Sequence, residues 1–355
     1  NLVETGAVLV PDKATEYGQL DDLILALVSH INKYVEVDED FLYLSTAYIL
    51  FTYRYSDVSN LGYIRVIGEF ECGKSRYLQA VGRLCYLPCI FSTAPTDASI
   101  FRVSERYPGT LVIDEGDKNF SDTNSLFVKI LNSGYQKEAS LIRCSGTSFT
   151  PESFGCYGPK VLACRYPYDD PALESRLISY NMQPKTREDI PLLLGQEFLE
   201  EQKVLRQQLM MYRLENLGTP QRTIPIIPEI GNRKNQIYFS ISLVVQSEML
   251  VAHVGSYLTK AYKDELIQRS VQGPEAELLH IISTLLKQHG EKIPLKSIAK
   301  QYNEEHDLEK MNTRQIGKCL RGMNLHTSPG TGNVTCYEHK EPLFKQAASK
   351  YGLVQ

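Results

Sequence analysis

The stretch from Gly68 to Ser75 reads Gly-Glu-Phe-Glu-Cys-Gly-Lys-Ser, which is the spacing G-x-x-x-x-G-K-S. Glycine adopts backbone angles that other residues avoid, so Gly68 and Gly73 allow this loop to curl with its N–H groups pointing inward. Inward N–H groups hold phosphate oxygens, the lysine of this pattern reaches the β- and γ-phosphates, and its serine hydroxyl binds Mg²⁺. We therefore predict a site for ATP and Mg²⁺ formed by Gly68, Glu69, Phe70, Glu71, Cys72, Gly73, Lys74 and Ser75.

The flanking sequence has the local structure that this motif needs. Tyr63–Ile67 is short and β-prone, which predicts a strand, and Arg76–Leu84 has apolar residues at helical spacing. A helix that starts near Lys74 would add the positive end of its dipole to the phosphate site. The alternative is a chance match on an ordinary strand, turn and helix, and a second motif argues against it.

That second motif is Thr110–Glu115, an apolar run that ends in two carboxylates. It predicts a buried parallel strand with acids at its carboxyl end, where ligands bind in open α/β sheets. There Asp114 would hold Mg²⁺, and Glu115 would act as the general base for the attacking water. Taken alone, the run would favour a strand that ends in a solvated acidic turn. The complete phosphate loop upstream favours the catalytic interpretation instead.

Length and composition limit the class of protein. A chain of 355 residues with 43% hydrophobic content predicts two or three domains with real cores. The formal net charge of −4 means that any nucleic-acid site must be a local basic patch. Eight cysteines without C-x-x-C pairs or zinc spacing predict a reducing compartment, which we take to be cytoplasmic. We find no signal peptide and no apolar run of the ~18 residues that a membrane span needs. The first residue is Asn1, so we expect a fragment of a longer chain.

The order of predicted elements indicates an α/β fold with four parts. These are an N-terminal helical segment (1–58), a nucleotide-binding core (59–185), a helical lid and linker (186–272) and a winged-helix domain (273–355). In the core, strands alternate with helices, which is typical of a parallel sheet covered on both faces. The predicted core strands are Tyr63–Ile67, Pro88–Phe91, Thr110–Ile113 and Lys160–Cys164. The predicted helices are Leu20–Tyr34, Phe41–Tyr53, Arg76–Leu84, Ser99–Tyr107 and Asn124–Gly134.

The alternation breaks between Ala139 and Tyr157, where two β-prone runs flank Gly146. This pattern predicts a hairpin inserted into the core, with a surface loop as the alternative. Lys137 and Arg143 are the candidates in this region for contact with a nucleic-acid phosphate.

Residues 275–355 read as three helices, a Gly/Pro-rich turn and a β-prone end, an order that resembles a winged helix-turn-helix. The third helix, Thr313–Met323, carries Arg314, Lys318 and Arg321 at spacings of four and three, so they share one helical face. In a winged helix this element enters the DNA major groove, and we predict that the three residues contact DNA. Winged helices also serve as protein contacts, and that alternative stays open.

The motifs together resemble the AAA+ ATPases of mobile elements and phages, which are helicases and primase-helicases related to minichromosome maintenance helicases. The resemblance covers residues 40–245. Beyond the two motifs above, it rests on Ala98–Arg102, Ile130–Tyr135, Gly158–Ala163 and Asp170–Arg176. It implies an AAA+ parallel sheet with a helical lid. It also implies a homo-oligomeric ring, which we expect to be a hexamer, with ATP bound between subunits.

The resemblance also implies roles for two arginines. Arg176 matches the arginine finger, whose guanidinium would stabilise transition-state charge on the ATP of a neighbouring subunit. A solvated arginine at a helix end is the alternative for Arg176. Arg233 resembles the arginine that opens the lid helix and senses nucleotide, and Arg222 and Lys234 compete for that role.

One position departs from the family pattern. The strand Lys160–Cys164 should end in a small polar residue, usually Asn, that orients the water. Arg165 stands there instead. Arg165 as a cationic sensor, Asn132 in that role, and a slipped alignment are all open at this point.

The first functional hypothesis is an ATP-driven DNA motor, a replicative helicase or initiator of a mobile genetic element or phage. Its expected partners are DNA and further copies of the chain, and a primase or replication protein is another candidate. The alternatives are a nucleotide-switched DNA-binding loader that does not unwind, and an AAA+ protein remodeller. An aromatic residue in the pore would favour the protein remodeller, and a basic residue would favour the DNA motor. The sequence has one of each in this region, Tyr135 and Lys137, so both functions stay open.

Overall fold

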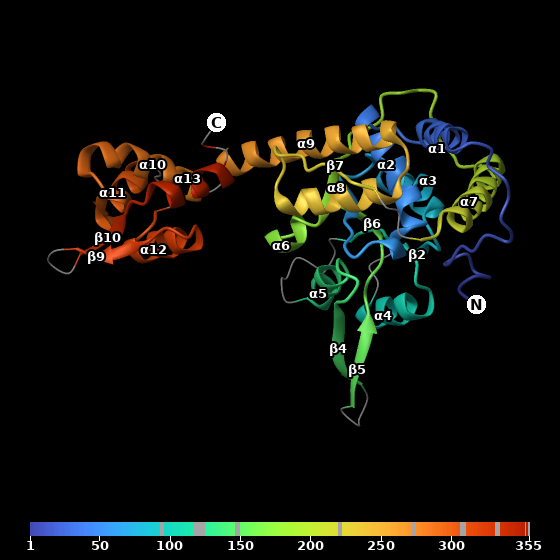
Figure 1. Cartoon of the computed structure of the whole chain (residues 1–355), viewed down its shortest axis with the longest axis horizontal. Helices are drawn as coiled ribbons and strands as arrows, with labels where there is room; N and C mark the ends of the chain where they lie inside the picture. Colours follow the sequence, from blue (N-terminus) through green and yellow to red (C-terminus); the bar gives the residue numbers. More distant parts are fainter. Residues whose placement is uncertain are drawn as a thin grey trace. The chain divides into compact units, whose positions relative to one another are not determined.

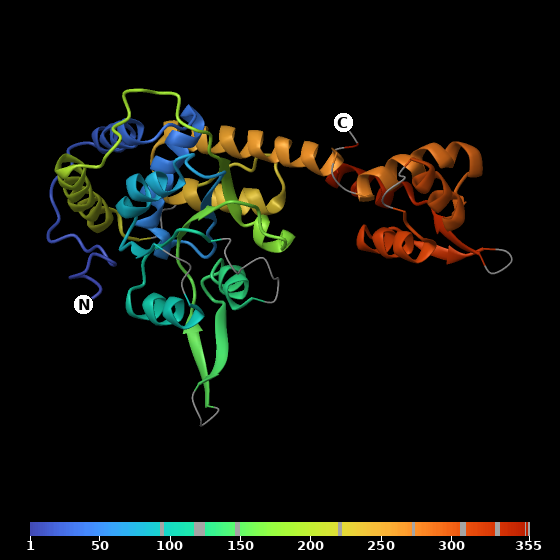
Figure 2. The same ribbon diagram turned by 180° about the vertical axis from the view of Figure 1, so that it is seen from behind.

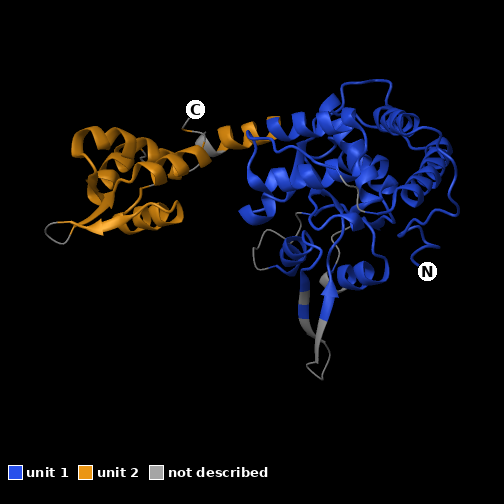
Figure 3. Ribbon diagram, viewed as in Figure 1, with its two compact units in different colours: residues 1–259 blue, residues 260–355 orange. Residues whose placement is uncertain are grey.

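The computed structural model describes all residues except 93–95, 117–124, 146–149, 219–221, 272–273, 306–309, 331–333, 352 and 354–355 (Figure 1). The side chain of Arg143 also lies outside the described part. The chain forms two compact units, residues 1–259 and residues 260–355 (Figure 3). Among the described residues, no helix has both the length and the apolar character that a membrane crossing requires.

The core of the first unit is a parallel sheet of five strands in the order β2-β3-β6-β1-β7. Four strands lie within one residue of their predicted bounds: β1 (Tyr63–Ile67), β2 (Cys89–Phe91), β3 (Leu111–Ile113) and β6 (Lys160–Cys164). Strand β6 lies between β1 and β3, so the carboxyl ends of these three strands are neighbours. This sheet confirms the predicted α/β class.

The fifth strand, β7 (Leu177–Asn181), is not predicted by the sequence. It pairs with β1 alone, with Leu177 opposite Tyr63. Only its first two residues, Leu177 and Ile178, are buried. Two buried residues give too short an apolar run to distinguish an edge strand from a loop.

Helices surround the sheet (Figures 1 and 2). The Tyr48 hydroxyl in α2 hydrogen-bonds to the backbone of Gly62 and Lys160, which fixes α2 against β1 and β6. From another helix, α5, the Leu131 carbonyl accepts a 2.7 Å hydrogen bond from Tyr63 Oη. The helices up to α6 are α1 (Leu20–Tyr34), α2 (Glu39–Thr52), α3 (Lys74–Ala80), α4 (Asp97–Arg106), α5 (Leu126–Ser133) and α6 (Pro171–Glu174).

The segment 186–272, predicted as lid and linker, contains α7 (Gln196–Asn216), α8 (Asn232–Val244) and α9 (Glu248–Val271). Helix α7 packs along α1, where Lys33 Nζ donates to the carboxylates of Glu197 at 2.7 Å and Glu201 at 2.6 Å. Helix α8 packs on α2 instead. The first two helices of this segment therefore contact different helices of the N-terminal segment (1–58).

The inserted segment is a hairpin. Strands β4 (Ser140–Ser145) and β5 (Thr150–Gly155) pair antiparallel, with Ser140 opposite Gly155. The returning strand starts at Thr150, and residues 146–149 between the two strands lie outside the described part. The hairpin leaves the first unit beside α4 and α5 (Figures 1 and 2).

The second unit has its own apolar core around a three-stranded antiparallel sheet of order β8-β10-β9. Ile298, Ile316, Leu320 and Tyr337 lie at its centre, each almost fully buried. The predicted three helices are present, together with two strands and a final helix that the sequence does not predict. Its elements are α10 (Pro274–His289), β8 (Lys292–Pro294), α11 (Leu295–Glu305), α12 (Thr313–Gly322), β9 (Thr327–Pro329), β10 (Thr335–Glu338) and α13 (Glu341–Lys350).

Candidate nucleotide site and candidate nucleic-acid interface

The phosphate loop connects the end of β1 to the start of α3. Gly73 has φ 92°, a left-handed angle that favours glycine. At Gly68 the requirement is steric, because a Cβ atom would lie 2.6 Å from Cys72 Sγ and 2.9 Å from the Met182 carbonyl oxygen. Both glycines of the motif are therefore needed for the shape that the loop adopts.

Lys74 is folded back onto its own loop. Its Nζ atom donates to the carbonyl oxygens of Gly68 and Glu69, each at 2.6 Å. The thiol of Cys72 donates to the same Glu69 carbonyl at 3.0 Å. The ammonium group is thus held at the loop, where phosphate oxygens could replace the two carbonyls as its partners.

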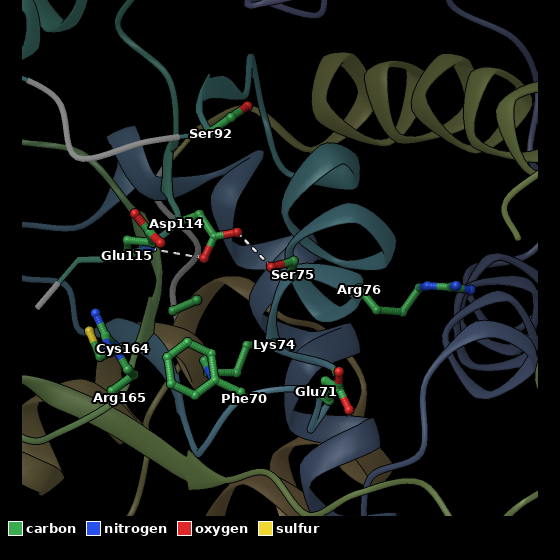
Figure 4. A pocket seen from close by; sticks show the side chains of 12 residues that line it. Phe70, Glu71, Lys74, Ser75, Arg76, Ser92, Asp114, Glu115, Cys164 and Arg165 are labelled. Carbon is green, nitrogen blue, oxygen red and sulfur yellow. Dashed lines mark hydrogen bonds between the residues drawn. The ribbon is translucent and has the colours of Figure 1, made fainter. Parts of the chain in front are cut away.

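The acids after β3 meet the phosphate loop at the carboxyl edge of the sheet (Figure 4). Ser75 Oγ donates a 2.7 Å hydrogen bond to Asp114 Oδ2, and the other Asp114 oxygen accepts from the Glu115 N–H at 2.9 Å. Glu115 itself has φ 54°, which is uncommon for a residue with a side chain. The turn at this residue is held by the Gly116 N–H, which donates to the Ala163 carbonyl at 2.9 Å.

Ser75 and Asp114 fit a Mg²⁺ ion by the chemistry of their donor atoms. Mg²⁺ takes oxygen ligands, and in nucleotide sites it uses one or two protein ligands beside substrate phosphates and water. A hydroxyl and a carboxylate that are 2.7 Å apart supply such a pair. Among the described residues there is no cluster of three or more His, Cys, Asp or Glu side chains that could hold a metal alone.

These residues line a cavity of about 360 Å³. Phe70 stands at its edge with 71% of its surface exposed, and the Arg165 guanidinium lies 5.2 Å from the Phe70 ring centroid (Figure 4). Asn132 does not line the cavity; its Nδ2 atom donates to Asp170 at 2.7 Å. The residues around the cavity are Phe70, Glu71, Gly73, Lys74, Ser75, Arg76, Ser92, Asp114, Glu115, Ala163, Cys164 and Arg165.

Arg176 and Arg233 lie together, away from this cavity. Both guanidinium groups pack on the buried Tyr135, at 5.4 Å and 4.7 Å from its ring centroid. The Nε atom of Arg176 is buried and has no hydrogen-bond partner among the described residues. Burial lowers the pKa of Arg176 from its ordinary value, and the neighbouring charge of Arg233 acts in the same direction.

The sheet places Arg176 at the edge opposite the phosphate loop. The Arg176 carbonyl accepts from the N–H of Tyr63, the first residue of β1, whereas the phosphate loop follows the last residue, Ile67. Strands rise about 3.3 Å per residue, so the five residues of β1 separate the two edges by roughly 16 Å. Lys234, one of the competitors of Arg233, is buried and donates to the Leu177 carbonyl at 2.8 Å.

The two basic residues near the hairpin that are candidates for nucleic-acid contact, Lys137 and Arg143, lie in different surroundings. Lys137 is exposed, and its Nζ atom donates to the Ser56 carbonyl at 2.7 Å. Arg143 lies in β4 opposite Glu152, but its side chain is outside the described part. Tyr135, the aromatic candidate of this region, is fully buried.

In the second unit, α12 presents Arg314, Lys318 and Arg321 to solvent, while Ile316 and Leu320 enter the core. Beside this exposed face is a hollow of about 340 Å³. It is lined by Leu295, Lys296, Thr313, Arg314, Gly317, Arg321, Thr327, Val334 and Thr335. The lining has three cationic side chains and no acidic one.

Sequence reasoning missed Lys296 as a member of this basic surface. Lys296 lies in the first turn of α11, and only the packing of α11 beside α12 brings it near Arg314 and Arg321. Within one helix, basic spacing can be read from the sequence, but proximity between two helices cannot. At the N-terminus of α12, the Asn312 side chain accepts from the Arg314 and Gln315 N–H groups and caps the helix.

No family model matches the chain, and no curated protein sequence matches it. Several solved structures are similar in shape. The C-terminal region of NrS-1 is 13% identical and covers 92% of this chain and 76% of its own, with a TM-score of 0.44. The active helicase SCCmec type IV Cch is 13% identical and covers 96% of this chain and 72% of its own, with a TM-score of 0.46. The Aeropyrum pernix ORC1 protein in complex with DNA is 13% identical and covers 93% and 97%, with a TM-score of 0.28. At these values the similarity gives no activity for this chain.

Proposed function

We propose that this chain is an ATP-hydrolysing motor that acts on DNA, a replicative helicase or initiator of a mobile genetic element or phage. The observation that carries the proposal is the Ser75–Asp114 hydrogen bond, which joins two sequence motifs 39 positions apart in one cavity. Lys74, Ser75 and Asp114 supply the ammonium, hydroxyl and carboxylate that bind Mg²⁺ and the ATP phosphates. Glu115 stands beside them as the general base.

The roles of these residues follow from charge. The Lys74 ammonium leaves the two loop carbonyls and binds β- and γ-phosphate oxygens, which carry more negative charge. The Glu115 carboxylate accepts a proton from the water that attacks the γ-phosphate, and its backbone is held by the Asp114 carboxylate through the 2.9 Å hydrogen bond. A bound Mg²⁺ ion would add neutralising charge on the phosphates. Arg165, at the edge of the cavity, is the proposed cationic sensor.

The opposite placement of Arg176 supports a homo-oligomer, which we infer to be a hexameric ring. An arginine at the amino edge of the sheet is too far from the cavity of its own chain. It can serve the cavity of a neighbour if the amino edge of one subunit faces the carboxyl edge of the next. Arg233 shares the Tyr135 platform and is the proposed nucleotide-sensing arginine of the same interface.

DNA contact is assigned to two places. The helix, strand, two helices and two strands of the second unit have the order of a winged helix, and α12 is its recognition helix. Arg314, Lys318 and Arg321, extended by Lys296, form the proposed contact with phosphates. In the first unit, Lys137 and the β4–β5 hairpin, including Arg143, are the proposed contacts for a strand in the ring. A primase or another replication protein is the proposed further partner.

The loader and remodeller remain the rival functions. The burial of Tyr135 speaks against the remodeller, because a pore aromatic must be exposed to grip a polypeptide. The loader differs from the motor only in that its ATP hydrolysis does not separate DNA strands. A labelled forked DNA duplex with ATP and Mg²⁺ separates them: the motor displaces the labelled strand, and the Glu115→Gln protein does not. DNA-stimulated ATP hydrolysis without displacement would make the chain a loader, and absence of hydrolysis would contradict both.

A further inference from the structure

A buried cluster connects the nucleotide cavity to the turn that carries Arg176. Its centre is Arg65, in the middle of β1, with 1% of its surface exposed. Arg65 Nη1 and Nη2 donate to the two carboxylate oxygens of Glu174, each at 2.6 Å. Its guanidinium also donates to Ser179 Oγ, at 2.8 Å and 3.1 Å, and lies 5.2 Å from the ring centroid of Tyr168. A cation in a sheet interior needs such a complete set of partners.

Tyr168 extends the cluster to the turn of the general base. Its backbone N–H donates to Glu174 Oε1 at 2.7 Å, and its hydroxyl donates to the Gly116 carbonyl at 3.0 Å. Gly116 follows Glu115 directly, and a Cβ atom at Gly116 would lie 3.2 Å from the Tyr168 hydroxyl. The hydroxyl therefore packs directly against the turn that sets the direction of the Glu115 side chain.

The other end of the cluster is the turn before β7. Glu174 is the last residue of α6, two positions before Arg176. The Arg176 N–H donates to the Leu173 carbonyl at 2.9 Å, and its guanidinium donates to the Ala172 carbonyl. A displacement of Glu174 would therefore move the turn from which Arg176 projects.

We propose that Tyr168, Arg65 and Glu174 are positioning residues that hold the Glu115 turn and the Arg176 turn in a fixed relation. The inference rests on the proposed function, in which these two turns serve two different ATP sites. In the ring, a structural change at the ATP cavity of one subunit would displace Gly116 and Tyr168. Through Arg65 and Glu174 it would then shift the position of Arg176, which this subunit presents to its neighbour. The cluster lies entirely inside the first unit, so the link needs no movement of the second unit.

The protonation states of Arg65 and Tyr168 are those that the hydrogen bonds of this network require. Burial opposes the charged form of Arg65, but the hydrogen-bonded Glu174 carboxylate offsets this and keeps the pKa of Arg65 above its ordinary value. Burial raises the pKa of Tyr168 well above its ordinary value, so this hydroxyl stays protonated and donates to the Gly116 carbonyl. Arg65 and Tyr168 therefore keep the protonated forms that donate these hydrogen bonds.

Tyr168→Phe tests the proposal, because it removes one hydroxyl and keeps the ring beneath Arg65. Tyr55→Phe is the matched control, since the Tyr55 hydroxyl also donates to one backbone carbonyl, that of Pro108, at 2.9 Å. We expect Tyr168→Phe to lower kcat for ATP by about tenfold to hundredfold with little change in KM, as misplaced catalytic groups do. Thermal stability should fall by a similar amount in the two variants, because the only other partner of the Tyr168 hydroxyl among the described residues is the weak donor Cys164 Sγ at 3.5 Å. A purely structural role would therefore not separate their kcat values.

Mixed oligomers test the link to Arg176. Subunits with Glu115→Gln keep the arginine, and subunits with Arg176→Ala keep the cavity, so their mixture has active mixed interfaces. Tyr168→Phe should lower the activity of the mixture from either side, whether it is placed in the subunit that supplies the cavity or in the subunit that supplies the arginine. A loss only in the cavity subunit would overturn the link to Arg176.

Different measurements would contradict the network of Tyr168, Arg65 and Glu174 and the proposed ATP hydrolysis. If the wild-type chain hydrolyses ATP, Glu115→Gln is inactive and Tyr168→Phe equals Tyr55→Phe in kcat, the network proposal is wrong and the proposed function stands. If the wild-type chain does not hydrolyse ATP, or Glu115→Gln is as active as wild type, the proposed function is wrong and the network proposal falls with it.

Discussion

Ser75 Oγ and Asp114 Oδ2 lie 2.7 Å apart, although 39 positions separate the two residues in the sequence. The contact exists because β1 and β3 are parallel and both lie beside β6, which places the residues that follow them at one edge of the sheet. The two oxygens face the cavity that contains Lys74 and Glu115.

Lys74→Ala should abolish nucleotide binding, because no other ammonium group lines the described part of the cavity. Titration with a fluorescent ATP analogue measures the loss. Lys129→Ala is the control, since Lys129 is exposed on α5 and does not line the cavity. Wild-type affinity in the Lys74→Ala protein would contradict the assignment of this loop as the phosphate site.

Asp114→Asn should raise the Mg²⁺ concentration needed for half-maximal ATP hydrolysis, because the amide removes a negative charge from the proposed metal site. Excess EDTA should stop hydrolysis by the wild-type protein. The readout is the rate of phosphate release across a Mg²⁺ series at saturating ATP. An unchanged Mg²⁺ requirement would remove Asp114 from the metal site.

Lys160 should make stability depend on pH. Burial lowers its pKa from the ordinary 10.5 to about 7. Between these values the unfolded chain binds more protons at Lys160 than the folded chain does, so the contribution of Lys160 to the free energy of unfolding rises with pH, by at most about 1.4 kcal/mol per pH unit. Lys160→Met should remove this slope. Urea unfolding at pH 7.5, 8.5 and 9.5, which lie about one unit apart between the folded and unfolded pKa values of Lys160, measures this slope. The exposed Lys129→Met is the control. Parallel pH profiles of wild type and Lys160→Met would contradict the shifted pKa.

The combined substitution Arg314→Ala, Lys318→Ala and Arg321→Ala should weaken duplex DNA binding and flatten its salt dependence. Each lost phosphate contact removes about 0.9 from the log–log salt slope, so the slope should fall by roughly 2–3 units. Adding Lys296→Ala should remove about one more contact. Binding of the full chain to a labelled duplex across a salt series measures this. The control is Lys345→Ala, because this lysine pairs with Glu341 on α13. An unchanged slope would make the second unit a protein-contact module.

The parts of the fold that could be predicted are those with a local signal. The strand Tyr63–Ile67, the glycines around the phosphate loop and the acids after Ile113 each have a pattern within ten residues. Strand β7 could not be predicted, because only Leu177 and Ile178 are buried and its pairing with β1 depends on a partner more than a hundred positions away. Strand β7 depends on a tertiary contact, and the periodicity of the sequence does not reveal such contacts.

In the candidate sites, too, residues that act through tertiary contacts could not be recognised from local sequence patterns. Arg176 could be singled out only by the family resemblance, and its distance from the phosphate loop became clear only from the pairing of β7 with Tyr63. Arg65 reads as an ordinary polar residue in a strand, and its bond to Glu174 spans 109 positions. Lys296 joins the basic surface only through the packing of α11 beside α12.

The most direct test of the central claim, an ATP site completed by a second copy of the chain, is the mixing of two inactive proteins. Glu115→Gln keeps Arg176 but lacks the general base, and Arg176→Ala keeps the cavity but lacks the arginine. Each alone should bind ATP and hydrolyse it at a negligible rate. A mixture, with exchange of subunits verified by a fluorescence-transfer label, should regain ATP hydrolysis with a maximum near equal amounts. Full exchange without any recovery of hydrolysis at any ratio would contradict the claim that Arg176 acts on the neighbouring subunit.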